Sequence, residues 1–214
     1  MHTAKAATRE RILETALALF SVQGYEATSV AEIASAVGIR KASLYSHFAC
    51  KQDILDSLLQ SIMAHYETHS IFTKADWTNT AFLAEMERLT EDAMIRTILA
   101  QVRFILHDPL ICRGRKLLTI EQFRNPRLAA LQTKQNYTDV MQYFSGLVRF
   151  LIGRGALADG DPESMAAELC LPLSVWINLC DREPEREDDV MALAERHLAQ
   201  FFLRNRPPEP NKTA

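Results

Sequence analysis

The sequence has few of the residues that interrupt helices or cross-link chains: 7 glycines, 8 prolines and 4 cysteines among 214 residues. Scarce glycine and proline exclude collagen-like and low-complexity chains. The cysteines form no Cys-x-x-Cys pair, which argues against a zinc site or a disulfide framework, so we expect no metal and no cofactor. No segment approaches the roughly 18 apolar residues of a membrane helix, and the pattern of a signal peptide is absent. We therefore expect a cytoplasmic protein that does not contact a membrane.

A strong charge of one sign is also lacking, because the formal net charge is −3. The charge is nevertheless uneven. Residues 1–51 hold six Lys and Arg against four Asp and Glu, a net +2, and the remaining residues hold 18 against 23, a net −5. A mildly basic head on an acidic body favours a protein that meets phosphate with one end only. The acidic body argues against an architectural protein that wraps DNA.

Sustained alternation of apolar and polar residues is missing, and apolar residues instead recur every three or four positions almost throughout. This periodicity predicts an all-α fold of about nine helices, and the length favours one small domain followed by a larger one. We expect helices at about residues 4–22, 51–70, 79–107, 109–121, 126–153, 162–180 and 185–205, besides the two short helices described below.

Several boundaries of these helices carry local signals. A capping side chain followed by proline, which the first helical turn tolerates, predicts helix starts at Asp108-Pro109, Asn125-Pro126 and Asp161-Pro162. Gly24 should end the first helix, and Pro172 should kink the helix at 162–180.

Two short helices joined by a tight turn are predicted between residues 29 and 48. Ser29-Val30-Ala31-Glu32 is a capping box, so a helix should begin at Ser29 and end near Val37. Gly38 follows where a tight turn needs positive φ, and the helical pattern resumes at Lys41. The small and apolar residues that a steep helix crossing requires are present as Ile33, Ala34, Val37, Ile39, Leu44 and Phe48.

The same segment leaves a set of mostly polar residues free of any core role, namely Arg40, Lys41, Ala42, Ser43, Tyr45, Ser46 and His47. In a helix-turn-helix the second helix enters the major groove with its N-terminus first, so these side chains should face the bases and phosphates of double-stranded DNA. Other interpretations stay open. The cluster could be a solvated surface, His47 could pack beside Phe48, and Tyr45 could be a core aromatic.

The stretch from Gly24 to about Leu55, GYEATSVAEIASAVGIRKASLYSHFACKQDIL, resembles the tetracycline-repressor (TetR) class of bacterial transcriptional regulators. Its Leu-Tyr-x-His-Phe-x-x-Lys core carries most of the specificity. The resemblance implies two sets of contacts with DNA. Phosphates would be held by Ser29, Ser43, Tyr45 and Lys51. Bases would be read or abutted by Arg40, Lys41, Ala42 and His47. Lys51 could instead be an ordinary surface lysine.

The resemblance also implies a DNA-binding domain at 1–50 and a ligand-binding and dimerisation domain at 51–206. The proline-rich end cannot continue a helix, so we expect a flexible tail at 207–214. The last two helices of each subunit would form a four-helix bundle across a two-fold axis, although they could instead pack inside one monomer. The expected homodimer contacts are Leu169, Leu173, Trp176, Ile177, Leu198, Phe201 and Phe202. The middle helices would enclose an unidentified small-molecule effector, and its candidate contacts, which could equally be ordinary core, are Ile62, Tyr66, Met86, Arg103, Phe104, Tyr137, Met141 and Phe144.

These features together predict a ligand-responsive transcriptional regulator that binds a palindromic operator as a dimer and is released by an inducer. Family habit alone favours repression over activation. An enzyme built on helices is the alternative from another class. The sequence has no Gly-rich phosphate loop, no metal-ligand spacing and no nucleophile elbow, so we expect that the protein is not an enzyme.

Overall fold

The computed structural model describes residues 2–208, with side chains from residue 5 onward, and this part of the chain contains helices and loops but no strand. The predicted all-α class is confirmed. When 126–153 is counted as one helix, the described residues form nine helices of eight residues or more, as expected. Most of the predicted tail, from residue 209, lies outside the described residues. Contacts divide the chain into two compact units: 1–69 with 108–133 (unit 1), and 70–107 with 134–214 (unit 2).

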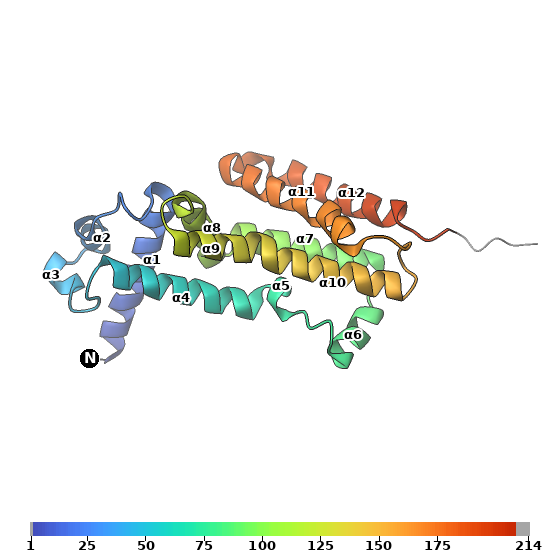
Figure 1. Cartoon of the computed structure of the whole chain (residues 1–214). Coiled ribbons are helices and arrows are strands. Elements are labelled where there is room, and N and C mark those ends of the chain that lie inside the picture. Colours follow the sequence, from blue (N-terminus) through green and yellow to red (C-terminus); the bar gives the residue numbers. More distant parts are fainter. Residues whose placement is uncertain (1, 209–214) are drawn as a thin grey trace, which may run out of the picture. The chain divides into compact units, whose positions relative to one another are not determined.

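Unit 1 consists of α1 (His2–Gln23), α2 (Val30–Val37), α3 (Lys41–Leu44), α4 (Lys51–His69), α8 (Pro109–Glu121) and α9 (Pro126–Thr133) (Figure 1). The apolar stripe of α1 is buried, including Ile12 and Phe20. It packs against α2, α4 and α8, so α8 and α9 share one core with the first helices of the chain. Unit 1 is therefore larger than the segment 1–50 that the sequence assigns to the DNA-binding domain.

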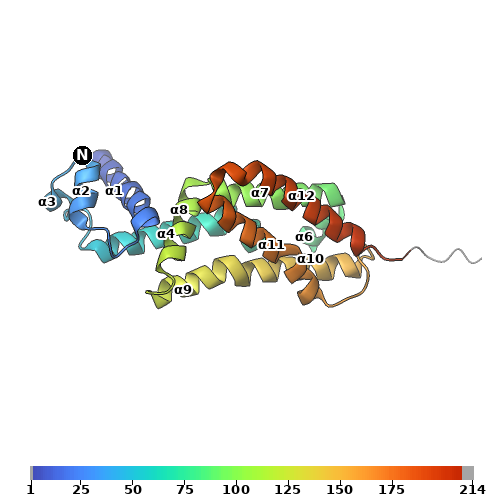
Figure 2. The same ribbon diagram turned by 90° about the horizontal axis from the view of Figure 1, so that it is seen from above.

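Unit 2 consists of α5 (Ile71–Lys74), α6 (Thr80–Glu87), α7 (Glu91–His107), α10 (Asp139–Gly153), α11 (Pro162–Arg182) and α12 (Glu187–Arg204). Figure 2 shows α11 between α10 and α12, and contacts join α11 to both neighbours. The core of this unit includes Phe144 from α10, Leu169 from α11 and Phe201 from α12, all fully buried.

The helix starts predicted from Asp-Pro and Asn-Pro pairs are confirmed. The Asp108 carboxylate accepts hydrogen bonds from the N–H groups of Leu110 and Ile111 at 3.1 and 3.0 Å. The Asn125 side chain accepts from Arg127 N and Leu128 N, and Asp161 accepts from Ser164 N. In each case the side chain satisfies amides that have no partner inside the helix.

Two of the long predicted helices are interrupted. The prediction of a single helix over 79–107 is wrong, because the helical conformation is interrupted between α6 and α7. Thr90 Oγ1 accepts a hydrogen bond from Ala93 N at 3.2 Å and so caps the start of α7. The helix expected over 126–153 is present but contains a π-helical turn, Lys134–Thr138. Lys134 Nζ spans this turn to both carboxylate oxygens of Asp139, at 2.9 and 2.7 Å. The boundary between the two units falls at the start of the same turn.

Candidate nucleic-acid interface

The turn between α2 and α3 has the local chemistry that the sequence predicts. Glu32 N donates to Ser29 Oγ at 3.1 Å, and Ser29 N donates to the Glu32 carboxylate at 2.7 Å, which completes the capping box. These hydrogen bonds lower the pKa of Glu32. Gly38 ends α2 in the left-handed region with φ +80°. No atom lies within 4 Å of a Cβ built at this position, so the backbone conformation, not lack of space, favours glycine.

The α2–α3 crossing buries one side of α3 and exposes the other. Leu44 and Phe48 lie in the core of unit 1. The residues on the opposite side are exposed, namely Arg40, Lys41, Ala42, Ser43, Tyr45 and Ser46. Within the described chain, the side chains of Arg40, Lys41 and Tyr45 make no hydrogen bond or ion pair with another residue. Their donors and charges are therefore available to a partner.

His47 differs from its neighbours because it is half-buried. Its Nδ1 atom is fully buried and has no hydrogen-bond partner among the described residues. The imidazole lies in the turn after α3, directly before the buried Phe48. His47 is therefore partly enclosed by the protein, whereas its neighbours are exposed to solvent.

Lys51 is the first residue of α4, and its side chain hydrogen-bonds to the loop between α1 and α2. Its Nζ donates to the backbone carbonyls of Tyr25, Glu26 and Thr28 at 2.9, 3.4 and 3.0 Å. The same ammonium lies 4.2 Å from the centre of the Tyr25 ring. A lysine has three N–H donors, and all three are engaged by this loop.

Glu121, at the end of α8, holds the same loop. Its carboxylate is buried and accepts a hydrogen bond from Tyr25 N at 2.7 Å. Gly24 has φ +85°, and a Cβ at this position would lie 2.7 Å from the Glu121 carboxylate. The loop that leads into α2 is thus held by Lys51 of α4 and by Glu121 of α8. The sequence indicates this site only through Gly24, because Glu121 lies about a hundred positions along the chain.

The candidate effector residues are divided between the units. Ile62 and Tyr66 are buried in unit 1, and the remaining six belong to unit 2. Of those six, Met86 and Phe144 are buried, Phe104 and Met141 are half-buried, and Arg103 and Tyr137 are exposed. Because Arg103 and Tyr137 are exposed, they differ from the side chains that line an enclosed apolar binding site.

Unit 2 contains an aromatic cluster that the sequence analysis did not identify. Its rings are Phe72, Trp77, Phe82, Tyr143, Phe144 and Phe150, with neighbouring centroids 5.1 to 6.2 Å apart. Trp77 Nε1 is buried without a hydrogen-bond partner in the described chain, and burial raises the pKa of Tyr143 to about 12. A Cβ at position 146 would meet the Trp77 indole at 2.2 Å, so Gly146 of α10 makes room for this ring.

The residues expected at a dimer interface lie mostly inside a single chain. Six of the seven are buried in the core of their own chain: Leu169, Leu173, Ile177, Leu198, Phe201 and Phe202. Trp176 is half-buried. The large apolar residues that α11 and α12 expose are Leu171 and Val175 on the first helix and Leu193 and Leu203 on the second.

Two kinds of site are not found in the described part of the chain. No group of three or more His, Cys, Asp or Glu side chains is placed to hold a metal ion. Among the helices between residues 2 and 208, none combines the length and the apolar character needed to span a bilayer.

A buried α2–α3 crossing with an exposed, partly basic second helix is the arrangement found in helix-turn-helix domains. Residues 12–58 match the family described as bacterial regulatory proteins, tetR family. Over this segment the chain is similar to regulators of the TetR family, as the sequence resemblance indicates.

Curated relatives match in the same region. The transcriptional repressor KstR2 of Mycobacterium tuberculosis is 44% identical over 55 residues, which are 26% of this chain and 28% of that protein. The regulator AcrR of Shigella flexneri is 45% identical over 51 residues, or 24% of each chain. The matched region thus spans about a quarter of these relatives.

Solved structures match the fold along nearly the whole chain. A TetR-family regulator from Mesorhizobium loti has a TM-score of 0.63 at 20% identity and covers 95% of this chain and 98% of its own. A regulator from Saccharomonospora viridis, solved in complex with choline, has a TM-score of 0.62 at 22% identity, with coverages of 94% and 97%. The complex of SmeT with triclosan has a TM-score of 0.60 at 20% identity and covers 97% of both chains.

Proposed function

We propose that this protein is a ligand-responsive transcriptional repressor, not an enzyme, that acts in the cytoplasm. It binds a near-palindromic operator as a homodimer and is released by a small-molecule inducer. The observation that carries the proposal is the outer side of α3, where Arg40, Lys41 and Tyr45 are exposed and make no contact that would compete with DNA. The names of curated relatives, which include repressors, favour repression over activation.

Within this interface the residues have different roles. Arg40, Lys41 and Ala42, at the N-terminal end of α3, approach base edges. Ser29, Ser43 and Tyr45 contact phosphates, which position the protein without reading sequence. Lys51 acts as a positioning residue, because the carbonyls of the Gly24–Thr28 loop occupy its donors.

Titration of the wild type and of Lys41→Ala tests this division of roles. The duplexes are one selected from a random pool and a scrambled version of it. Lys41→Ala should lose about 1–3 kcal/mol of discrimination at particular base pairs. An equal loss of affinity on both duplexes would show that Lys41 does not recognise bases. Failure of the wild type to bind either duplex would refute the proposed function.

A homodimer is supported by the exposed apolar residues of α11 and α12 and by the demands of DNA recognition. Val175, Leu171 and Leu203 are 64, 40 and 53% exposed, and the two helices that carry them contact each other. One recognition helix contacts few bases, so a single head would be too unspecific to find its site in a genome. Two-fold symmetry of the protein would then impose two-fold symmetry on the operator.

The aromatic cluster of unit 2 supports an effector that is apolar or amphipathic. Rings bind such ligands by apolar contact, and the unpaired Trp77 Nε1 offers one directional hydrogen-bond donor. Proteins of the same fold have been solved with choline and with triclosan, and another is described as flavonoid-responsive. Two of the candidate effector residues in unit 2 lie in this region: Phe144 belongs to the aromatic cluster, and Met141 packs against the same core.

Release of DNA would follow from the way unit 1 is connected. The chain passes between the units at His69–Ser70, His107–Asp108 and Thr133–Lys134; α4 ends at the first crossing and α8 begins at the second. Lys51 and Glu121, at the far ends of these two helices, hold the loop that leads into α2. An effector that favours another placement of α4 or α8 therefore acts on the recognition helix. By thermodynamic reciprocity the operator must weaken effector binding by the same factor.

A further inference from the structure

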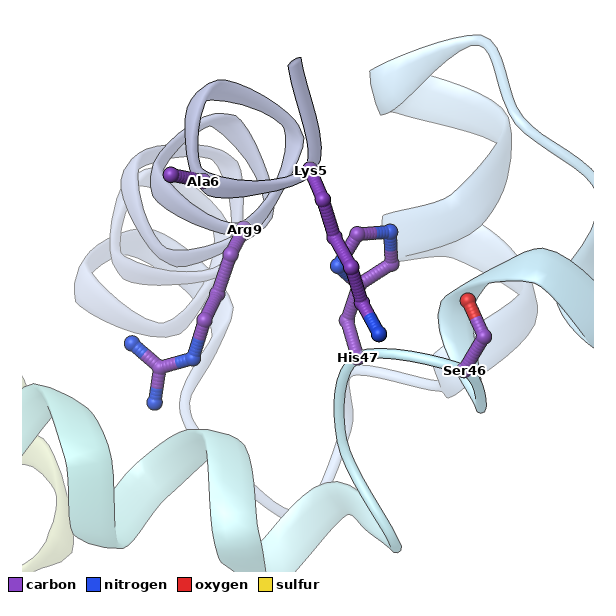
Figure 3. A pocket seen from close by; sticks show the side chains of 5 residues that line it. All are labelled: Lys5, Ala6, Arg9, Ser46 and His47. Carbon is purple, nitrogen blue, oxygen red and sulfur yellow. The ribbon is translucent and has the colours of Figure 1, made fainter. Parts of the chain in front are cut away.

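Unit 1 contains an open cleft beside the recognition helix. It has a volume of about 310 Å³ and is lined by Lys5, Ala6 and Arg9 of α1 and by Ser46 and His47 of the turn after α3. Figure 3 shows the Lys5 side chain extending from α1 alongside the His47 ring, with Arg9 one helical turn further along α1. Residues four positions apart lie on the same side of a helix, so both side chains leave α1 on the side that lines the cleft.

The charge of the cleft is entirely positive. Lys5 and Arg9 are exposed, and none of the lining residues is acidic. Within the described chain the Lys5 ammonium has no hydrogen bond or ion pair. The Arg9 guanidinium is held 4.7 Å from the centre of the Phe48 ring, and one of its nitrogens donates to Ser57 Oγ at 3.0 Å. Arg9 thus keeps a fixed place and still has N–H donors to offer, since a guanidinium carries five.

His47 adds a donor to this cleft. Its Nδ1 atom is buried without a partner in the described chain, which leaves Nε2 as the ring nitrogen that can meet an outside partner. With its proton on Nε2, the imidazole offers an N–H donor to such a partner. Ser46 Oγ already donates to Ser43 O at 2.7 Å, which fixes the turn that presents both side chains.

We propose that this cleft binds a backbone phosphate of the duplex that α3 contacts, through Lys5, Arg9 and His47. The inference rests on the proposed function and deepens it, because it adds two residues of α1 to the interface and moves His47 from the bases to the backbone. Two cations and an N–H donor offer donors and positive charge alone, which suit the acceptor oxygens of a phosphate whatever the sequence of the duplex. The turn at Ser46–His47 follows directly on α3. When α3 lies in the major groove, the sugar-phosphate backbone of the DNA that borders the groove must pass close to this turn.

The test measures binding of the full-length protein to two duplexes, one selected from a random pool and one of arbitrary sequence, over a range of salt concentrations. The variants are Lys5→Gln and His47→Leu. Lys74→Gln is the matched control, because Lys74 is exposed, belongs to unit 2 and loses the same charge. Thermal unfolding of each variant shows that unit 1 remains folded.

Lys5→Gln should lower the slope of log K against log salt by about 0.9 for each bound head, which is about an eightfold loss of affinity at 0.1 M salt. His47→Leu should weaken binding by similar factors on both duplexes, and Lys74→Gln should change neither slope nor affinity. A Lys5→Gln slope equal to that of the control would overturn the proposal. A His47→Leu loss confined to the selected duplex would return His47 to base reading. In both cases the wild type still binds DNA, so the proposed function itself stands.

A second arm separates a duplex phosphate from a free anion. The imidazole N–H signal of His47, assigned with the His47→Leu variant, is followed by NMR. It should shift with the arbitrary duplex and stay in place with inorganic phosphate at the same phosphate concentration. Saturation by inorganic phosphate alone would assign the cleft to a small anion and refute its role in the DNA interface.

Discussion

Replacing Lys51 by methionine keeps the aliphatic stem of this side chain and removes its ammonium, which separates a positioning role from a phosphate contact. Two of the three hydrogen bonds to the Gly24–Thr28 loop are short, at 2.9 and 3.0 Å, and the third is long at 3.4 Å. Lys51 is half-buried, so each short bond contributes about 1 kcal/mol net and the contact with the Tyr25 ring about 0.5 kcal/mol. We therefore expect a loss of about 2–3 kcal/mol in the free energy of unfolding of unit 1.

Denaturant unfolding measures this loss, and hydrogen exchange of the amides from Gly24 to Ser29 shows where it arises. The control is Lys74→Met, an exposed lysine whose removal should change the stability by less than about 0.5 kcal/mol. DNA affinity should fall for Lys51→Met without a change in its salt slope, because no phosphate contact is lost. Unchanged stability together with a slope lower by about 0.9 for each head would refute the positioning role and make Lys51 a phosphate ligand.

Three further predictions concern the dimer, the turn and the aromatic cluster. Val175→Glu should give folded monomers by light scattering, whereas Phe201→Glu should unfold unit 2 by burying a charge in its core; folded dimers of both variants would contradict the assignment. Gly38→Ala should cost about 1–2 kcal/mol because its φ is +80°, and Gly153→Ala, at an open position in a helix, should cost nothing by the same unfolding assay. The pKa of Tyr143 is raised to about 12, so its neutral form stabilises unit 2 fully below pH 10, and this stabilisation is lost as the pH rises from 10 through about 12. A titration of phenolate absorbance should show a late step that is absent from Tyr143→Phe. Persistence of that step in the variant would contradict the assignment.

The local features of unit 1 could be predicted because they depend on residues a few positions apart. The capping box at Ser29, the left-handed Gly38 and the proline-marked helix starts all involve partners within four residues. The hydrogen bonds of Lys51 and Glu121 to the Gly24–Thr28 loop link distant helices. No spacing in the sequence relates Glu121 to Tyr25, so this contact could not be predicted.

The surfaces of α11 and α12 show a different limit of sequence reasoning. α11 is apolar on two sides, with Leu169, Leu173 and Ile177 on one and Leu171 and Val175 on the other. Periodicity finds both stripes but does not say which one the chain buries against itself. Trp77 was missed for another reason. It lies in the loop between α5 and α6, where helical periodicity carries no information, and its place beside Gly146 depends on tertiary packing.

Enrichment of duplexes from a random pool by the full-length protein tests the central claim most directly. The wild type should enrich sequences with two inverted half-sites, spaced about one helical turn apart or a multiple of it. Lys41→Ala should relax the preference at the same positions in both half-sites, because a symmetric dimer presents the same residue twice. Failure of the wild type to enrich any sequence would contradict the account, and so would enrichment of a single half-site without an inverted partner.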